Sequence, residues 1–204
     1  MKLYNSVGPN PRVVTMFLAE KGLSVPAVHI DIMKGENRQE AYVGGVNPTG
    51  TTPALELDDG SVLTEITAIC EYLEERQPSP ALIGSTPEER AATRMWARRV
   101  DLKICEPLTN GFRFAEGLGM FKDRFRCLPE AAPGLKATAR DGLEWLEGQL
   151  KGPWIAGDRF TLADILLFAF VDFGAAVGQP LDPAWAKLND WYGRMKARPS
   201  AAQS

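Results

Sequence analysis

The chain has 204 residues and a formal net charge of −3, with 45% hydrophobic and 24% charged residues. This composition is typical of a globular protein that can bury a core, and it excludes a disordered chain. An acidic balance without a dense Lys/Arg run argues against nucleic acid as a partner. No apolar stretch reaches the roughly 18 residues that cross a bilayer, and the N-terminus lacks a signal-peptide layout, so we expect no membrane partner and a cytoplasmic location.

The cysteine and histidine content limits the possible chemistry. Cys70, Cys105 and Cys127 are odd in number and far apart, which argues against a disulfide framework or a metal site and fits a reducing compartment. The single histidine, His29, lies in the apolar run AVHIDIM and is expected to be buried in a strand. A Ser-His-Asp or Cys-His catalytic system is therefore disfavoured.

Strand and helix signals alternate along the first 78 residues. Gly22 is expected to end the first helix, and Asp58-Asp59-Gly60 between two apolar runs is a strong hairpin signal. From periodicity and from the Gly and Pro breaks we expect a strand at 2–6, a helix at 12–21, a strand at 27–33, a short helix or loop at 34–42, strands at 53–57 and 61–64, and a helix at 65–76. The order is βαβαββα.

The rest of the chain is helical in pattern. We expect a domain at 1–78, a Pro-rich linker at 79–85 and an all-helical domain at 86–204. Thr86-Pro87-Glu88-Glu89 and Thr161-Leu162-Ala163-Asp164 have the form of capping boxes, and Pro107 is expected to kink the first long helix. Further helices are expected within 134–150, 162–174 and 182–199.

Three motifs resemble the cytosolic glutathione transferases over nearly the whole chain. GTTPALELDDGSVLTEITAICEYLEE is similar to the family's cis-proline strand, hairpin and third helix, and WIAGDRFTLADI is similar to its helical-domain capping motif. MKGENRQEAYVGGVNPTG resembles the second-helix loop of theta-like members, with Asn37 where those carry histidine. The resemblance implies a thioredoxin-like α/β domain followed by an all-α domain, glutathione as co-substrate without a metal, and a homodimer.

The expected glutathione site begins at Thr52 and Pro53. Proline cannot donate a ladder hydrogen bond, so a strand edge there is free to pair with an extended ligand. The resemblance implies a cis bond before Pro53 and hydrogen bonds between the Thr52 backbone and the cysteinyl unit of glutathione. An ordinary edge-strand proline is the alternative.

The two ends of glutathione need charged partners. Glu65 precedes a helix whose free N–H groups at Ile66 and Thr67 attract a carboxylate, so Glu65 is expected to hold the γ-glutamyl ammonium, or only to improve the helix terminus. Most family members carry serine at the position of Ile66, so one hydroxyl contact is lost. Asn37 and Arg38 are expected to bind the glycine carboxylate, or to belong to a solvated loop.

The thiol activator is not the usual one. A thiol has a pKa of about 8.5, so the enzyme has to stabilise the thiolate with donors. The serine of theta-like members falls on Gly8, the tyrosine of other classes on Ser6, and a cysteine on Asn10. Asn10 is the preferred donor, and helix capping is its alternative role; Ser6 is the second candidate.

This chain resembles, in its KGEN and LDDG motifs, an atypical subgroup of the family that lacks the first-domain Tyr, Ser or Cys. In such a protein a residue of the second domain can take part in activating the thiol. Thr109 and Arg113 are four residues apart and share a helix face, where they are expected to hold an activating water or to add positive potential. Ordinary solvent-exposed residues are the alternative.

The expected function is a glutathione transferase that directs the thiolate at an electrophilic small molecule in a cleft between the two domains. Reduction of disulfides or hydroperoxides needs the same thiolate and is the alternative reaction. A non-catalytic ligand carrier or interaction protein on the same fold is the alternative from another class, which the residues Gly8 and Ile66 make credible.

Overall fold

The computed structural model describes residues 1–203 and divides the chain into two compact units. The first comprises Met1–Leu82 with the C-terminal helix α10 (Pro199–Gln203), and the second comprises Ile83–Arg198. The α/β and all-helical characters are as predicted. The placement of α10 differs from the prediction, because Arg12 Nη2 donates to the Ala201 carbonyl at 3.1 Å and the buried Ser200 hydroxyl bonds to Glu20. These contacts attach α10 to the first unit.

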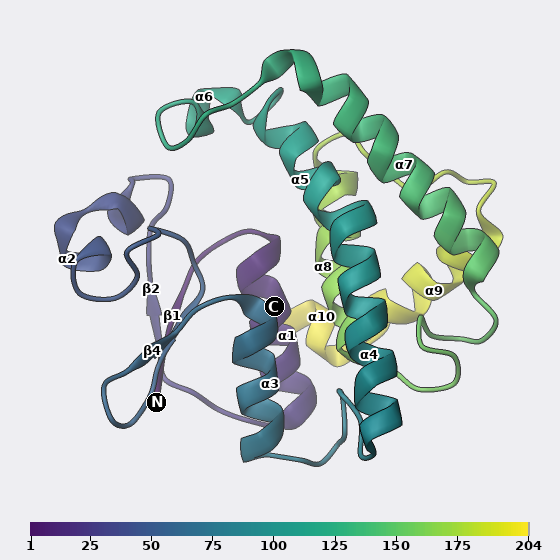
Figure 1. Cartoon of the computed structure of the whole chain (residues 1–204), viewed down its shortest axis with the longest axis horizontal. Coiled ribbons are helices and arrows are strands. Elements are labelled where there is room, and N and C mark those ends of the chain that lie inside the picture. The colour runs from purple at the N-terminus through teal and green to yellow at the C-terminus, as the bar shows by residue number, and fades with distance from the viewer. Residues whose placement is uncertain (204) are drawn as a thin grey trace. The chain divides into compact units, whose positions relative to one another are not determined.

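A four-stranded mixed sheet forms the centre of the first unit. Its strands are β1 (Lys2–Asn5), β2 (Ala27–His29), β3 (Ala54–Glu56) and β4 (Val62–Leu63), in the order β2-β1-β3-β4. β1 and β2 are parallel, and β3 is antiparallel to β1 and to β4. Helices α1 (Pro9–Lys21) and α3 (Ile66–Arg76) pack side by side along the sheet (Figure 1). A short 3-10 turn η1 (Glu36–Arg38) and α2 (Glu40–Val43) complete the unit.

The prediction for His29 is wrong. All three residues of β2 are exposed, because β2 is an edge strand of the sheet. The buried residue of the AVHIDIM run is Ile30, directly after the strand. The alternation of apolar residues therefore indicated a strand correctly but did not show that its faces stay uncovered.

A buried ion pair joins α1 to α3 in the first unit. The Lys21 and Glu74 side chains are 0% and 2% exposed and form a salt bridge between the end of α1 and α3. Lys21 Nζ also donates to the Gln77 carbonyl at 2.7 Å and to the Pro80 carbonyl, and the Leu82 N–H donates to Glu74. A buried charge is tolerated when it is paired and its remaining protons are satisfied. This network fixes the segment that leaves α3.

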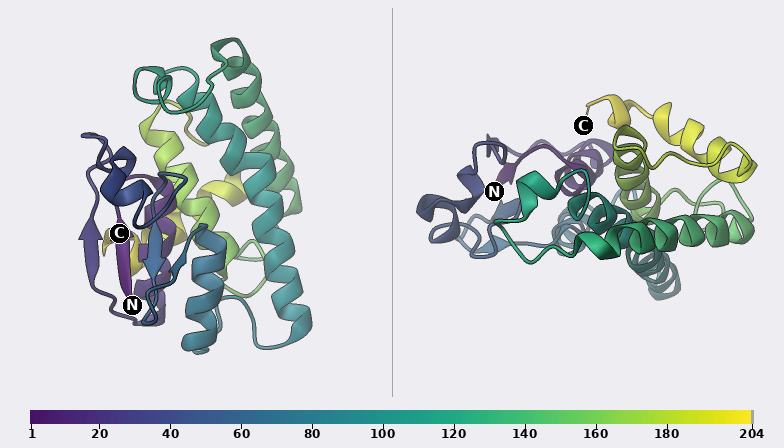
Figure 2. Two further views of the ribbon diagram at one scale, coloured as in Figure 1. Left: turned by 60° about the vertical axis from the view of Figure 1, so that its left-hand side comes forward. Right: turned by 90° about the horizontal axis from the view of Figure 1, so that it is seen from above.

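The second unit is a helical bundle around one apolar helix. Its helices are α4 (Pro87–Val100), the π-helical turn η2 (Asp101–Cys105), α5 (Glu106–Arg113), α6 (Leu118–Phe121), the 3-10 turn η3 (Pro129–Ala131), α7 (Ala132–Gln149), α8 (Leu162–Ala176) and α9 (Ala186–Lys196). α8 packs against α4, α5 and α9, and it is the yellow-green ribbon inside this unit in Figure 2. A helix that is apolar on all sides is stable only in such a buried position.

A π-helical turn precedes Pro107, where the sequence predicted a kink. The turn η2 lies between α4 and α5 and ends two residues before Pro107. A proline ring cannot donate an N–H and collides with the preceding turn, so the backbone adds an extra residue to the turn there. No helix among the described residues is long and apolar enough to cross a membrane.

One of the two predicted capping boxes is complete, and the other forms only the side-chain cap by Thr86. Thr161 and Asp164 form a complete box at the start of α8. At α4, the Thr86 hydroxyl accepts from the Glu89 N–H at 3.2 Å, whereas the Glu89 carboxylate accepts from the Ser85 N–H at 2.7 Å. At α4 the Glu89 carboxylate therefore bonds to the residue before the N-cap, Ser85, instead of to the N–H of Thr86.

Candidate functional site

Several chain segments end at the same edge of the β-sheet. The antiparallel β1–β3 register, continued past its last pair, sets Ser6 opposite Thr52. The β3–β4 register, continued in the same way, sets Pro53 opposite Glu65. α1 begins just after β1 and α3 begins just after β4, so both helix N-termini lie at this edge. The fold thus gathers strand ends and N–H-rich helix ends in one place.

The loop before β3 is held by two residues that the sequence analysis did not select. The Tyr42 hydroxyl donates to the Thr51 carbonyl at 2.7 Å, and Asn47 Nδ2 donates to the same carbonyl at 2.9 Å. Asn47 Oδ1 accepts from the N–H and hydroxyl of Thr49. The Asn-Pro turn in VNPTG was the available signal, because asparagine before a turn commonly bonds the backbone two residues on.

The loop presents Thr52 with unpaired backbone groups. The Thr52–Pro53 peptide bond is cis, as the resemblance implied. Within the part of the chain that the structure describes, the N–H and carbonyl of Thr52 make no hydrogen bond. Thr52 is partly exposed, so both groups are available to an extended ligand.

Asn37 and Arg38 meet this loop at Gly50. Asn37 is 4% exposed, and its Nδ2 donates to the Gly50 carbonyl at 2.6 Å, so the solvated-loop alternative is wrong for Asn37. Arg38 is exposed, and its side chain lies against Gly50. Gly50 has a φ of +65°, and a Cβ there would lie 3.0 Å from the Asn37 carbonyl oxygen. Only glycine fits this contact without displacement.

Glu65 has a backbone conformation that side chains avoid. Its φ is +66°, the only positive φ at a non-glycine position in residues 1–203. The side chain makes no capping hydrogen bond to α3 and is exposed. Glu65 is the N-cap residue of α3 without a side-chain cap hydrogen bond, so only its charge is available to improve the helix terminus. Backbone strain of this kind costs about 1 to 3 kcal/mol and occurs preferentially where a side chain has to point at a ligand.

The N-terminus of α1 offers few backbone donors. Residues 9 and 11 are prolines without an N–H, and the Arg12 N–H donates to the Gly8 carbonyl at 3.2 Å. The N–H of Asn10 is left, and the Asn10 side-chain amide has no hydrogen-bond partner among the described residues. Gly8 occupies the cap position without a side-chain cap, so Asn10 does not cap the helix. Its amide is partly exposed and free to donate.

Ser6 has a structural hydrogen bond instead. Its hydroxyl donates to the Ile30 carbonyl at 2.6 Å and so ties β1 to the segment after β2. A hydroxyl has one proton, and a thiolate needs a donor. The geometry therefore disfavours Ser6 as the activating group.

In the helical unit, the side chains of Thr109 and Arg113 each donate a hydrogen bond to a nearby residue. Thr109 is 5% exposed, and its hydroxyl donates to the Cys105 carbonyl at 2.7 Å. Arg113 Nη1 donates to Asn110 Oδ1 at 3.1 Å, and Asn110 Nδ2 donates to Glu106. Thr109 is thus a buried back-bonded residue and not an exposed one, which overturns its alternative reading.

The cysteine thiols have no activating surroundings in the core. Cys70 and Cys105 are buried, and burial raises the pKa of both thiols well above the ordinary range. Cys127 is partly exposed in the segment after α6. Within the described residues, no group of three His, Cys, Asp or Glu side chains is arranged to hold a metal ion.

Comparison with known protein families gives two consecutive matches. Residues 7–76 match the glutathione S-transferase N-terminal domain, and residues 129–199 match the glutathione S-transferase C-terminal domain. The first match lies in the α/β unit, and the second lies in the helical unit up to its last residue, Pro199, which begins α10.

Individual relatives match over nearly the full length. The chain is 35% identical to glutathione S-transferase 2 of Saccharomyces cerevisiae, across 98% of this chain and 87% of the relative. It is 35% identical to a maleylacetoacetate isomerase of Pseudomonas aeruginosa, across 94% and 88%. The crystal structure of Gtt2 from Saccharomyces cerevisiae superposes with a TM-score of 0.92 at 34% identity, covering 100% of this chain and 99% of that one.

Proposed function

This chain belongs to the glutathione S-transferase family, and on that premise we propose that it binds glutathione at the sheet edge built by β1, β3 and β4 and activates its thiol there. The observation that carries the proposal is the set of polar groups left without protein partners at this one edge: the Thr52 backbone, the Glu65 carboxylate and the Asn10 amide. Glu65 is exposed and Thr52 and Asn10 are partly exposed, so these groups are available to a ligand that replaces the water around them.

Each part of glutathione has a partner of matching chemistry. Glu65 holds the γ-glutamyl ammonium, and the N–H groups of Ile66 and Thr67 at the start of α3 take its carboxylate. The backbone of Thr52 pairs with the cysteinyl unit beside the cis bond to Pro53. These assignments use one extended ligand along the sheet edge.

Arg38 binds the glycine carboxylate of glutathione. Asn37 supports that contact, since its Nδ2 bonds to the Gly50 carbonyl and the Arg38 side chain lies against Gly50. A guanidinium is the better carboxylate partner because it can donate two parallel hydrogen bonds. Asn37 thus acts as a positioning residue.

Asn10 activates the thiol. Its side-chain amide and its backbone N–H both donate at the N-terminus of α1, where the helix dipole favours an anion. Lowering a thiol pKa by about two units requires roughly 2.7 kcal/mol, which two such donors supply. We place the chain in the subgroup that lacks the first-domain Tyr, Ser or Cys, with Thr109 as a structural residue of α5.

The reaction is a nucleophilic displacement or addition. The glutathione thiolate attacks an electrophilic carbon of a small molecule and a carbon–sulfur bond forms. In a displacement the leaving group departs with its electron pair. In an addition the electron pair of the broken bond moves to the neighbouring atom of the substrate, which takes up a proton. The helical unit contributes the side chains that bind this second substrate. We further propose that the protein is cytoplasmic and forms a homodimer. Sedimentation velocity tests the dimer directly.

Reduction of disulfides or hydroperoxides is the alternative reaction, and a non-catalytic carrier is the alternative from another class. A self-contained thiol redox centre is disfavoured, since burial keeps the thiols of Cys70 and Cys105 protonated. The relative named maleylacetoacetate isomerase adds isomerisation as a reaction to assay. Product analysis separates conjugates from glutathione disulfide and from isomers.

The first test is a calorimetric titration of glutathione in two buffers with different ionisation heats. We expect binding with proton release, because the bound thiol ionises. Asn10→Ala is expected to lose most of the proton release, whereas Ser6→Ala is expected to keep it because that hydroxyl bonds to Ile30. Binding without proton release would indicate a carrier, and the absence of binding would refute the proposed site.

A further inference from the structure

The Thr51 carbonyl receives hydrogen bonds from two buried side chains of the first unit. The Tyr42 hydroxyl donates to it at 2.7 Å and Asn47 Nδ2 donates to it at 2.9 Å. Tyr42 and Asn47 are 4% and 1% exposed. A carbonyl oxygen has two lone pairs, so these two donors use its full capacity. The carbonyl is therefore fixed in direction and is not available to a ligand.

Both donors are themselves fixed by their surroundings. The Tyr42 ring packs edge-on against the Tyr4 ring, with centroids 6.1 Å apart, and burial raises the pKa of the Tyr42 hydroxyl to about 12, so it stays a proton donor. Asn47 Oδ1 accepts from the N–H and the hydroxyl of Thr49 at 3.1 Å and 2.8 Å, which leaves Nδ2 to donate to Thr51. The positions of the two donors do not depend on a ligand.

The Thr51 carbonyl belongs to the same peptide unit as the N–H of Thr52. The cis bond of this loop is the next one, Thr52–Pro53, and the Thr51–Thr52 bond is trans. In a planar trans peptide unit the C=O and N–H bonds point in opposite directions. The bonds from Tyr42 and Asn47 to the oxygen therefore turn the Thr52 N–H to the other side. There it has no hydrogen-bond partner among the described residues.

The same two bonds strengthen the Thr52 N–H as a donor. A hydrogen bond to the oxygen of a peptide group draws electron density from its nitrogen and makes its proton more acidic. The bonds also prevent the peptide plane from turning, so a ligand does not have to order it on binding. The orientation and the donor strength of this N–H are thus both set by Tyr42 and Asn47.

We propose that Tyr42 and Asn47 are positioning residues for glutathione, which orient and polarise the Thr51–Thr52 peptide unit so that its N–H donates to the cysteinyl carbonyl. The inference rests on the proposed function for the identity of the ligand. Neither side chain touches glutathione in this assignment. Both residues therefore control the affinity for glutathione and not the activation of its thiol, which belongs to the start of α1.

Two tyrosine variants that each lose only a hydroxyl test the assignment. Tyr42→Phe keeps the ring and removes one donor to Thr51. Tyr4→Phe is the matched control, because the Tyr4 hydroxyl belongs to the same ring pair but donates to Glu56 at 2.7 Å. In calorimetric titrations with glutathione we expect the Kd to rise at least ~5-fold for Tyr42→Phe and to stay within ~2-fold of the wild type for Tyr4→Phe. KM for glutathione is expected to rise by the same factor, with kcat within ~2-fold.

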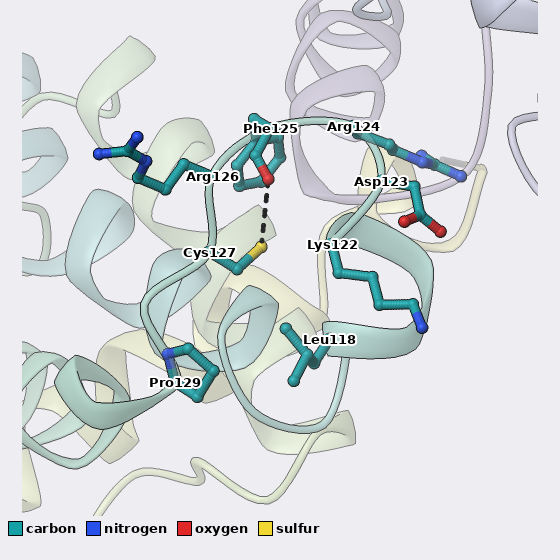
Figure 3. A pocket seen from close by; sticks show the side chains of 8 residues that line it. All are labelled: Leu118, Lys122, Asp123, Arg124, Phe125, Arg126, Cys127 and Pro129. Carbon is teal, nitrogen blue, oxygen red and sulfur yellow. Dashed lines mark hydrogen bonds between the residues drawn. The ribbon is translucent and has the colours of Figure 1, made fainter.

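A cationic pocket in the helical unit is a second place where the glutathione anion can bind (Figure 3). The pocket has a volume of about 600 Å³, and Lys122, Arg124 and Arg126 line it against one acid, Asp123. In Figure 3 the guanidinium groups of Arg124 and Arg126 extend to opposite sides of the pocket. Arg126 is exposed, so Arg126→Gln removes one charge there without a change in the first unit. We expect its Kd for glutathione to stay within ~2-fold of the wild type.

The Thr52 amide proton gives a readout that a purely structural role of Tyr42 would not change. Glutathione is expected to move its NMR resonance downfield in the wild type and in Tyr4→Phe, and by a smaller amount in Tyr42→Phe, because the hydrogen bond is weaker. Thermal unfolding measures the stability that each variant loses. If Tyr42→Phe does not fold, Asn47→Ala removes the other donor to the same carbonyl and is expected to raise the Kd by at least ~5-fold.

The possible outcomes separate this inference from the proposed function. An unchanged Kd in Tyr42→Phe, with only a lower Tm, would overturn the inference and leave the proposed function intact. A loss of kcat at unchanged KM would assign Tyr42 to the thiol, and weaker binding by Arg126→Gln alone would place the ligand in the helical unit; either result overturns the inference. The absence of glutathione binding by the wild type would refute the inference together with the proposed function.

Discussion

Glu65 combines a strained backbone with an exposed carboxylate at the start of α3. A β-carbon in this region of φ and ψ is unfavourable, and glycine removes that cost. The conformation therefore lowers stability at a position where the fold itself does not need a carboxylate. We propose that the conformation is kept because the Glu65 side chain points toward glutathione.

The variant Glu65→Gly is expected to raise the free energy of unfolding by about 1 kcal/mol and to weaken glutathione binding at least ~10-fold. Urea unfolding and calorimetry measure the two effects. Glu65→Ala is the matched control, because it removes the carboxylate and keeps the Cβ in the strained conformation. A glycine variant no more stable than the alanine variant would show that the conformation stores no strain.

Among the secondary-structure elements, α1 and α3 are joined by the buried pair of Lys21 and Glu74. We expect Lys21→Met to lower the free energy of unfolding by about 3 kcal/mol, because it leaves the Glu74 carboxylate buried without its cation. The double variant with Glu74→Leu is expected to recover most of the loss. Urea unfolding of the four proteins gives the coupling energy. Additive effects would contradict a direct ion pair.

The start of α8 carries a pH-dependent group. Asp164 accepts hydrogen bonds from Ile155, Thr161 and Trp191, yet complete burial raises its pKa from an ordinary 3.8 to about 6. The native state then binds a proton more readily than the unfolded chain, so this contribution to stability is full below about pH 4 and is lost as the pH rises through about 6.

The expected size of that loss is about 3 kcal/mol between the two limits. Subtracting the pH dependence of unfolding of Asp164→Asn from that of the wild type isolates it, since the amide does not titrate. The variant itself is expected to be less stable, because an amide group cannot accept from all these donors. A difference that rises with pH would mean that the hydrogen bonds outweigh burial.

At the scale of the whole molecule, the two ends of the chain meet in the first unit. α10 contacts α1 through Arg12, and Ser200 is 3% exposed against Glu20. Truncating the chain after Arg198 is expected to lower the free energy of unfolding of the first unit by about 1 to 2 kcal/mol. Hydrogen exchange of α1 amides measures the change in that unit. Ser200→Ala, which removes a single bond, is expected to lose a smaller part, and unchanged protection would refute the role of α10.

Local features of the fold were predictable from the sequence. Gly22 adopts the left-handed conformation that ends α1, with a φ of 64°. The Asp-Gly hairpin, the complete capping box at Thr161 and the change of helix before Pro107 also follow from local rules. Each depends on residues that are close together along the chain, so one sequence is sufficient to indicate them.

The sequence by itself determined the order of elements, the two kinds of unit and, through the motifs, the family. Only the tertiary structure decided that His29 lies on an open edge strand, that the proton of Ser6 is used by Ile30, and that α10 returns to the first unit. It also decided that Arg113 lies over the rings of Phe121 and Phe125, and that its buried Nε has no hydrogen-bond partner among the described residues. The physical reason is range: turns and caps are set by neighbours in sequence, whereas burial and hydrogen-bond pairing depend on residues that only folding brings together.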